Sequence, residues 1–527
     1  MGRINKHYFI ILIILFLATR LLMALFLAPH NDEIIYTQYA QIINQNWTAN
    51  KYVSVGGSFS GDYKEPLQYW LTSISVNWWT NPLWGVRLWS IIIGCFGFVS
   101  WLCLIKKIFG NRVVGIFGLL YLFSGYYLYF DSIGLAEVYI YSGGAIFFYL
   151  SYQWLTKRHW YYLFLASIIF ALALLTKNSA WLILFLAVFL PIILLVRGES
   201  NKRFYWSGGW FYVFLLSNIF IGKFVYNLVV GKKFETIRLA SPTFNFILSW
   251  SELSKLPINL WLVNLRFYLT QVVSSDGLFF LWLIILFLVV YLVGRDKQKF
   301  LWSSGKTLLV LGGWWLASFT PMVVLMRTTY FRHYGMWWLI FYLLIAFCLT
   351  LLIEALEKIT RNGLFVKVVV VLGSVLILNQ VYSSFDPLFK FGQTDAGEQE
   401  VTDLWMSPLG INDLIAYLKT LPSATVLFDD QWGHFSVDIS VFRNYYPNLR
   451  LIALESEDGR NLMMSSTDLR GQKVYIIFDT YWLDRGNSGP PLEQIAFNQK
   501  LCGKKKEIEK KYRQKIEDSK FVICEVQ

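Results

Sequence analysis

Long apolar runs constrain this chain more than any other feature of its sequence. The first run, "YFIILIILFLATRLLMALFLAP", is long enough for an α-helix to cross a hydrocarbon layer of about 30 Å. Similar runs recur over the first 382 residues. The 527-residue chain is 56% hydrophobic and only 15% charged, so soluble cores cannot hide its apolar surface. We therefore predict an α-helical polytopic membrane protein.

About eleven runs have the length of a membrane span. No Ala-x-Ala type cleavage site follows the first run, which we interpret as an uncleaved span. The predicted spans are 8–28, 83–105, 113–130, 133–155, 160–176, 180–196, 208–230, 277–294, 307–326, 335–353 and 366–382.

The distribution of Lys and Arg predicts the orientation. They are more frequent in the loops on the side of the N-terminus, which is therefore expected in the cytoplasm of a plasma (inner) membrane protein. An odd number of crossings then places the C-terminal part outside. The net charge of +13 is dispersed between apolar runs and forms no basic stripe, which argues against nucleic acid as a partner.

The predicted domains differ in composition. Residues 1–382 form the transmembrane domain, with outer loops 29–82 and 231–275, and residues 383–527 form a small extracytoplasmic α/β domain. In the latter, "GINDLIAYLKTLP" predicts an amphipathic helix, and "ATVLFDD", "RLIAL", "KVYIIFD" and "KFVICEV" predict buried strands. We interpret "KKKEIEKKYRQK" as a solvated helix face. "EIIYTQYAQIINQNW", which opens the first loop, predicts an interfacial helix.

Cysteine and histidine give little sign of chemistry. Cys95, Cys103 and Cys348 lie in spans as packing residues, whereas an oxidising compartment permits a disulfide between Cys502 and Cys524. His434, near two aspartates, is interpreted as a hydrogen-bonded structural residue. No metal-ligand set stands out, so no cofactor is predicted; a divalent cation stays possible but is not indicated.

Carboxylates gather at the predicted outer face. A single acid at the end of a span is an ordinary solvated cap, but acids together with cations at one membrane face indicate a site. The acids are Asp32, Glu33, Asp62, Glu65, Asp131 and Glu137, and the cations are Lys64, Lys177, Arg327 and Arg332. Arg20 lies about two turns inside the first span, where it either snorkels outward or pairs with an acid or a phosphate.

This combination suits transfer of a group from a lipid-linked donor. The sequence has no Gly-rich phosphate cradle, and a donor used outside the cell must arrive activated in the lipid. A polyprenyl-phosphate sugar meets that need. A positioned carboxylate serves as general base for a hydroxyl acceptor, and fixed cations stabilise the departing phosphate.

Three stretches carry a resemblance to a known family: "NDEIIYTQYAQII", "GDYKEPLQYWL" and "VRLWSIIIGCFGFVSWLCLIKKIFGNRVVGIFGLLYL". They resemble the GT-C class of membrane glycosyltransferases, especially the protein O-mannosyltransferases and the lipid A aminoarabinose transferases. The likeness covers residues 10–200 and continues afterwards by topology alone. It implies the GT-C fold and a reaction that inverts the anomeric carbon.

The resemblance also implies roles for particular residues. The family's Asp-Glu pair maps onto Asp32, the expected catalytic base, and Glu33 beside it. Its Lys-Pro-Pro-Leu motif maps onto "KEPL", which makes Lys64 a phosphate contact, and its second acid maps onto Glu137. Lys177 falls in "LTKNS", similar to the family's Leu-Thr-Lys-Gly. The residues further expected to bind the substrate are Tyr36, Asp131, Lys177, Arg332 and Arg20.

The chain departs from the family pattern at three positions, one of which is the second acid, where Glu137 replaces the family's usual Asp. Ile35 stands where some relatives have Arg, and Glu65 replaces the first Pro of the motif; Arg332 or Arg20 is the hypothetical compensating cation. The predicted partners are a polyprenyl-phosphate sugar, a glycan, lipid or protein hydroxyl acceptor, and membrane lipids. Two alternatives stay open: a transporter or flippase of lipid-linked sugars, and a membrane scaffold whose tail binds a partner.

Overall fold

The computed structural model describes the greater part of the transmembrane region and five segments of the tail. The described residues are 6–27, 30–51, 65–197, 202–239, 248–275, 282, 284–285, 299–327, 331–359, 411–428, 448–453, 473–479, 502–512 and 515–526. Lys64 and Asp62 fall outside them, as do His434, its neighbouring aspartates and the predicted boundary near residue 383.

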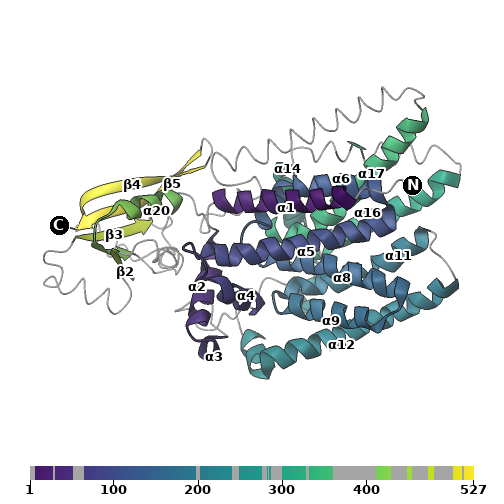
Figure 1. The fold of residues 1–527 in the computed structure, drawn as a ribbon, viewed down its shortest axis with the longest axis horizontal. Helices are drawn as coiled ribbons and strands as arrows, with labels where there is room; N and C mark the ends of the chain where they lie inside the picture. The colour runs from purple at the N-terminus through teal and green to yellow at the C-terminus, as the bar shows by residue number, and fades with distance from the viewer. Residues whose placement is uncertain are drawn as a thin grey trace.

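Helices dominate the first 359 residues, running side by side in Figure 1. In chain order they are α1 (Lys6–Phe26), α2 (Asn31–Gln45), α3 (Trp47–Asn50), α4 (Leu67–Ser75), α5 (Leu83–Phe109), α6 (Asn111–Leu122), α7 (Gly125–Phe130), α8 (Glu137–Lys157), α9 (Trp160–Leu174), the 3₁₀ turn η1 (Asn178–Ala180), α10 (Trp181–Ala187), α11 (Phe189–Val196), α12 (Lys202–Leu239), α13 (Trp250–Leu253), α14 (Ile258–Ser275), α16 (Lys299–Val324), the 3₁₀ turn η3 (Phe331–Tyr334) and α17 (Gly335–Ile359).

Within the described residues, six helical segments are long and apolar enough to cross a membrane. They correspond to the predicted spans 8–28, 83–105, 180–196, 208–230, 307–326 and 335–353. The predicted span 113–130 forms two helices, α6 and α7, because the chain breaks at Phe123 and Ser124. Spans 133–155 and 160–176 correspond to α8 and α9. Span 366–382 and almost all of 277–294 lie outside the described residues.

Glycines let neighbouring segments approach closely in the middle of the bundle. A Cβ atom placed on Gly97 of α5 would lie 2.5 Å from the side chain of Ser142 on α8. A Cβ on Gly134, in the turn before α8, would lie 2.3 Å from Val86 at the start of α5. Small residues at such crossings are how membrane helices gain packing, since lipid offers no hydrophobic driving force between helices. These contacts fix where α8 begins.

Gly134→Ala is expected to destabilise the protein by about 1–3 kcal/mol, because the added methyl group overlaps Val86. The apparent melting temperature of the purified protein in detergent measures this loss. Gly312→Ala in α16 is the matched control, since nothing lies within 4 Å of its added Cβ. The double variant with Val86→Ala should recover much of the loss. Equal melting temperatures for Gly134→Ala and Gly312→Ala would contradict the close packing.

The helix predicted at the start of loop 29–82 is present as α2, but it is more buried than an interfacial helix. Ile34 and Ile43 are almost completely buried. Tyr36 and Tyr39 each make an edge-on contact with Tyr69 of α4, at ring centroid distances of 5.4 and 5.8 Å. α2 and α4 therefore pack on each other at one end of the bundle, as Figure 1 shows.

The described part of the tail contains helix α20 (Ile411–Thr420) and a five-stranded sheet. The strands are β1 (Ala424–Phe428), β2 (Leu449–Ala453), β3 (Val474–Asp479), β4 (Cys502–Tyr512) and β5 (Lys515–Val526). Their order is β2-β1-β3-β5-β4, with β1 parallel to β2 and β3, and β5 antiparallel to β3 and β4. The predicted helix and the four predicted strands are all present.

The prediction of a helix for the basic run "KKKEIEKKYRQK" is wrong. Most of this run forms β4, the edge strand that pairs with β5. A strand buries alternate residues, and within the described side chains of β4 Ile508 is buried while Lys506 and Glu507 are exposed. Lysine along an edge strand also discourages pairing with another chain. Cys524 in β5 is disulfide-bonded, as the predicted bridge requires, whereas Cys95, Cys103 and Cys348 are free.

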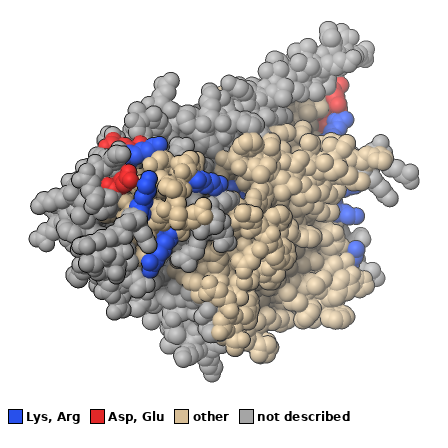
Figure 2. All heavy atoms as spheres, turned by 60° about the vertical axis from the view of Figure 1, so that its left-hand side comes forward, with Lys and Arg blue, Asp and Glu red and all other residues tan. Residues whose placement is uncertain are grey.

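The two ends of the chain lie far apart, and charged side chains border an uncharged area of the surface. Figure 1 places the N-terminus at the end of the bundle opposite to the C-terminal sheet. On the face in Figure 2, the Lys and Arg residues shown in blue lie toward the margins of a broad uncharged area. An uncharged band between charged ends is the surface that a bilayer-embedded protein requires.

Candidate active site

Four ionisable side chains and one histidine from distant parts of the sequence meet where α2, α8, η1 and η3 come together. We call Asp32, Glu137, Lys177, Arg332 and His333 the charged cluster. Arg332 Nη1 donates to Asp32 Oδ2 at 2.5 Å, and Arg332 Nε lies 3.7 Å from Glu137 Oε1. Lys177 Nζ donates to the same Oε1 atom and lies 3.2 Å from His333 Nε2. Arg332 therefore bridges the two acids, and Lys177 pairs with Glu137.

Asp32 is positioned by the start of α2. His30 is the residue before the helix; its Nδ1 accepts a hydrogen bond of 3.1 Å from the Asp32 backbone N–H. The His30 backbone N–H donates to Glu33 Oε2, which completes a reciprocal cap. Acids in a first turn also favour the positive end of the helix dipole. The Asp32 side chain is thus held at a fixed helix end, 7% exposed.

Two tyrosines of α7 hold the turn that carries Arg332 and His333. Tyr126 Oη donates to the Arg332 backbone carbonyl at 2.6 Å, and Tyr127 Oη donates to the Gly335 carbonyl at 2.5 Å. Both rings are buried. The short helix α7, which interrupts the predicted span 113–130, therefore fixes the backbone of the two cluster residues from η3.

Lys177 lies in the break between α9 and η1, where its backbone is extended. The Leu67 backbone N–H donates to the Leu175 carbonyl at 2.9 Å, so the start of α4 lies beside this break. Leu67, the last residue of "KEPL", therefore lies next to Leu175, the first residue of "LTKNS".

Tyr36 lies close enough to the charged cluster for the charges of Asp32 and Glu137 to shift the pKa of its phenol. Burial, followed by the negative charges of Asp32 and Glu137, raises the pKa of the Tyr36 phenol well above its ordinary value. The phenol therefore stays neutral at physiological pH and can act as a hydrogen-bond donor. That is consistent with its predicted place in the site.

A small pocket that opens to solvent adjoins the charged cluster. Glu137, Arg332 and His333 line its polar side, and Ile140, Leu182 and Met336 are among its apolar residues. Pockets that combine an apolar lining with a few convergent polar groups are the usual form of small-ligand sites.

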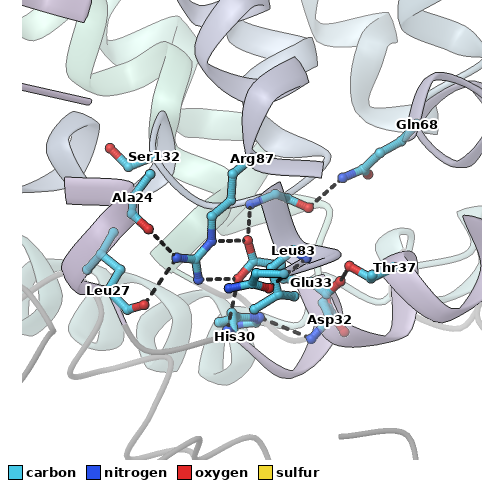
Figure 3. Close-up of polar contacts among 12 residues, drawn as sticks. Ala24, Leu27, His30, Asp32, Glu33, Thr37, Gln68, Leu83, Arg87 and Ser132 are labelled. Atoms are coloured by element: carbon cyan, nitrogen blue, oxygen red, sulfur yellow. Dashed lines mark hydrogen bonds and ion pairs between the residues drawn. The ribbon is translucent and has the colours of Figure 1, made fainter. Parts of the chain in front are cut away.

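Glu33 points away from Asp32 and forms a separate buried ion pair with Arg87 of α5 (Figure 3). Arg87 Nε and Nη2 donate to the two Glu33 oxygens at 2.6 and 2.8 Å, and Nη1 donates to the carbonyls of Ala24 and Leu27 at the end of α1. The Gly134 backbone N–H donates to Glu33 Oε1 at 3.0 Å. This pair ties together α1, α2, α5 and the turn before Glu137.

Glu33→Gln is expected to destabilise the protein by about 3–5 kcal/mol, because it leaves the buried Arg87 guanidinium uncompensated. Thermal unfolding in detergent measures the loss. Glu357→Gln is the matched control: its partner Arg112 and Glu357 itself are 54% and 42% exposed, so that pair contributes about 0–1 kcal/mol. If both variants lower the melting temperature equally, the Glu33–Arg87 pair does not hold these helices together.

Arg20 and Asp131 form a second buried pair, with Arg20 Nε 3.2 Å from Asp131 Oδ2 and both side chains fully buried. Arg20 also donates to the Leu122 carbonyl, and Asp131 accepts from the hydroxyls of Tyr121 and Tyr141. Of the alternatives open for Arg20, the structure therefore has pairing with an acid. Both charged groups have hydrogen-bond partners within the protein. The pair therefore stabilises the contacts between the segments that carry Arg20 and Asp131.

The structure brings together Asp32, Glu137, Lys177 and Arg332 of the predicted site residues, with Tyr36 beside them. It does not bring Glu33, Asp131 or Arg20 to that cluster, because each is bonded elsewhere. Lys64 lies outside the described residues. The sequence reasoning missed His333, although it is adjacent to Arg332, and Arg87, although an arginine inside an apolar run predicts a buried partner.

A metal site finds no support among the described residues, where no group of three His, Cys, Asp or Glu side chains could hold an ion.

Comparison with known proteins finds related sequence in one region and a related fold throughout. Residues 63–221 match the family model described as dolichyl-phosphate-mannose-protein mannosyltransferase. No curated protein matches the chain.

Three solved structures cover nearly the whole chain. ArnT from Cupriavidus metallidurans bound to undecaprenyl phosphate is 12% identical with a TM-score of 0.54, over 99% of this chain and 98% of ArnT. The same protein in the apo state is 13% identical with a TM-score of 0.52, over 97% of each chain. The oligosaccharyltransferase of Archaeoglobus fulgidus in the apo form is 12% identical with a TM-score of 0.51, over 92% of this chain and 71% of that one. At these identities the likeness establishes the fold.

Proposed function

We propose, from the premise that this chain has the GT-C fold of multi-pass membrane glycosyltransferases, that it transfers a sugar from a polyprenyl-phosphate donor to a hydroxyl acceptor. The observation that carries the proposal is the charged cluster: two carboxylates and two cations meet, and Glu137 and Arg332 among them line a pocket. The family match over residues 63–221 and the polyprenyl phosphate bound to ArnT support the choice of donor.

The carboxylate and the cations of the charged cluster have different roles in the proposed reaction. Asp32 accepts the proton of the acceptor hydroxyl while its oxygen attacks the anomeric carbon of the donor. The bond between that carbon and the phosphate oxygen breaks on the opposite side, which inverts the anomeric centre. Arg332 and Lys177 stabilise the negative charge that develops on the departing polyprenyl phosphate. Tyr36 donates a hydrogen bond to the bound sugar or phosphate.

The ion pair between Arg332 and Asp32 bears on the order of events. Arg332 is bonded to Asp32, and a carboxylate engaged by a guanidinium is a weak base. An incoming phosphate competes for Arg332 and frees Asp32 to accept a proton. The acceptor is therefore deprotonated only when the donor is in place.

Transfer of radiolabelled sugar from a polyprenyl-phosphate donor to a hydroxyl acceptor, by the purified protein in detergent, tests the function. Product in which the anomeric centre is inverted is the expected result. Movement of the intact donor across a vesicle membrane without new glycosidic bonds would instead indicate the flippase alternative.

The site is proposed to face outward, with the N-terminus in the cytoplasm and the tail outside. A reporter enzyme that is active only outside the cytoplasm, fused after residue 400, is expected to be active. The same reporter fused after Lys157 of α8, at the opposite end of that helix from Glu137, is the control and should be inactive. The reverse pattern would place the charged cluster on the cytoplasmic side.

A further inference from the structure

The end of α16 is capped by residues from an earlier part of the chain. The last carbonyls of an α-helix have no partner within the helix, and α16 ends at Val324, shortly before the turn that carries Arg332. Residues of the predicted outer loop 231–275 donate hydrogen bonds to four consecutive carbonyls here, those of Val323, Val324, Leu325 and Met326. The place where α16 stops is therefore set by this loop.

Asn264 of α14 makes two of these bonds with one amide group. Its Nδ2 donates to the Val323 carbonyl at 3.0 Å and to the Met326 carbonyl at 2.8 Å. An asparagine amide nitrogen has two N–H donors, so both are used. The other two bonds come from Trp261 Nε1, at 3.0 Å, and the Leu248 backbone N–H, at 2.8 Å.

The two faces of α14 differ. Asn264 and Tyr268, four residues apart, are 2% and 3% exposed, whereas Leu262 and Val263 are exposed. Burying an amide is costly unless it is hydrogen-bonded, so the bonds of Asn264 favour one register of α14 on α16.

The buried face of α14 also contacts the turn that carries Arg332. The Tyr268 ring centroid lies 4.7 Å from that of Tyr334 in η3 and 4.9 Å from that of Trp337 at the start of α17. From α7, Tyr126 donates to the Arg332 carbonyl. η3 is therefore held by both α7 and α14.

We propose that Asn264 is a positioning residue: by capping α16 it fixes the chain that leads into η3, and it thereby holds the Arg332 guanidinium against Asp32. Asn264 touches no member of the charged cluster itself, and η3 begins at Phe331, soon after the capped carbonyls. The consequence for catalysis rests on the proposed function, whereas the placement of Arg332 does not.

The coupling between Asp32 and Arg332 tests this placement without requiring turnover. Melting temperatures in detergent of Asp32→Asn, Arg332→Gln and the double variant give the coupling free energy of the pair. The same cycle is then measured in the Asn264→Ala background. There the pair should lose most of its coupling, because the guanidinium is no longer held at hydrogen-bond distance from the Asp32 carboxylate.

Asn218→Ala is the matched control for Asn264→Ala. Asn218 of α12 is also a buried asparagine with two hydrogen bonds: its Nδ2 donates to the Phe214 carbonyl at 2.7 Å, and its Oδ1 accepts from Ser167 of α9 at 2.9 Å. The control should lower the melting temperature by a similar amount and leave the coupling between Asp32 and Arg332 at its wild-type value.

Two milder variants keep the test decisive if Asn264→Ala does not fold. Trp261→Phe removes only the bond to the Val324 carbonyl and should weaken the coupling in the same direction. Glu252→Gln removes an exposed pair with Arg327 beside the capped carbonyls and should leave the coupling unchanged, because exposed ion pairs contribute little.

The transfer assay adds a readout of catalysis. Asn264→Ala is expected to reduce kcat by about 10–10²-fold, since small misplacements of a catalytic group are costly. In the Arg332→Gln background the same change should have little further effect, because both substitutions act through one guanidinium. A general loss of stability would instead add equally in both backgrounds.

The outcomes separate the positioning role from the proposed function. Absence of coupling in the wild-type protein, an unchanged coupling in folded Asn264→Ala or Trp261→Phe, or equal losses in Asn264→Ala and Asn218→Ala overturns the positioning role. If the coupling is lost as expected but the wild-type protein transfers no sugar, the proposed function fails while the placement of Arg332 by Asn264 stands.

Discussion

Asp32→Asn is expected to reduce the rate of sugar transfer by about 10²–10⁴-fold while donor binding is retained, because the amide cannot accept the proton of the acceptor hydroxyl. The substitution preserves the shape of the side chain and an oxygen for the hydrogen bond from Arg332. The loss should therefore appear in kcat rather than in the dissociation constant of the donor. Single-turnover measurements with pre-bound donor separate the two.

Glu252→Gln is the matched control for Asp32→Asn, because it removes one acid that is salt-bridged to Arg327 and lies outside the charged cluster. It should transfer sugar at close to the wild-type rate. Melting temperatures of both variants show whether they fold. Wild-type activity in folded Asp32→Asn would remove Asp32 from the role of base.

Arg332→Gln is expected to reduce kcat by about 10²–10³-fold, the usual cost of losing a group that stabilises developing negative charge. Arg332 is 11% exposed and contacts both cluster acids, so its charge acts in a site with little water. Arg332→Lys restores a positive charge without the planar fork and should recover part of the rate.

The two Arg332 variants distinguish charge from geometry. An intermediate rate for Arg332→Lys supports stabilisation of the departing phosphate by charge. Equal loss in both variants indicates that Arg332 acts chiefly through its bidentate geometry, and little loss in either would mean that other cations hold the phosphate.

Much of this fold follows from the sequence because spans, strands and loops have periodic signals. The long apolar runs predict α1, α5 and α17, and the short apolar runs of the tail predict β1 and β3. The break between α6 and α7 carries only the turn signal of the dipeptide Ser124-Gly125, which was overlooked because it lies within an apolar run long enough for one span. The edge strand β4 was missed because its charged residues suit an exposed helix and an exposed strand equally well.

The sequence does not predict which of the acidic residues form the charged cluster. Asp32 and Glu33 are neighbours, and nothing local indicates that one joins the charged cluster and the other pairs with Arg87. That division depends on α5 packing against the end of α1, a contact between residues more than fifty positions apart. Arg332 is likewise 300 residues from Asp32. Contacts between residues so far apart in the sequence depend on tertiary packing, which local sequence patterns do not reveal.

An experimental structure with polyprenyl phosphate bound tests the central claim most directly. The account predicts the phosphate at the charged cluster, within hydrogen-bond distance of Arg332 or Lys177, with the carboxylate of Asp32 facing the space beside it where the sugar would lie. A phosphate bound elsewhere, or Asp32 and Glu137 lying on opposite sides of the bound lipid in separate cavities, would contradict it.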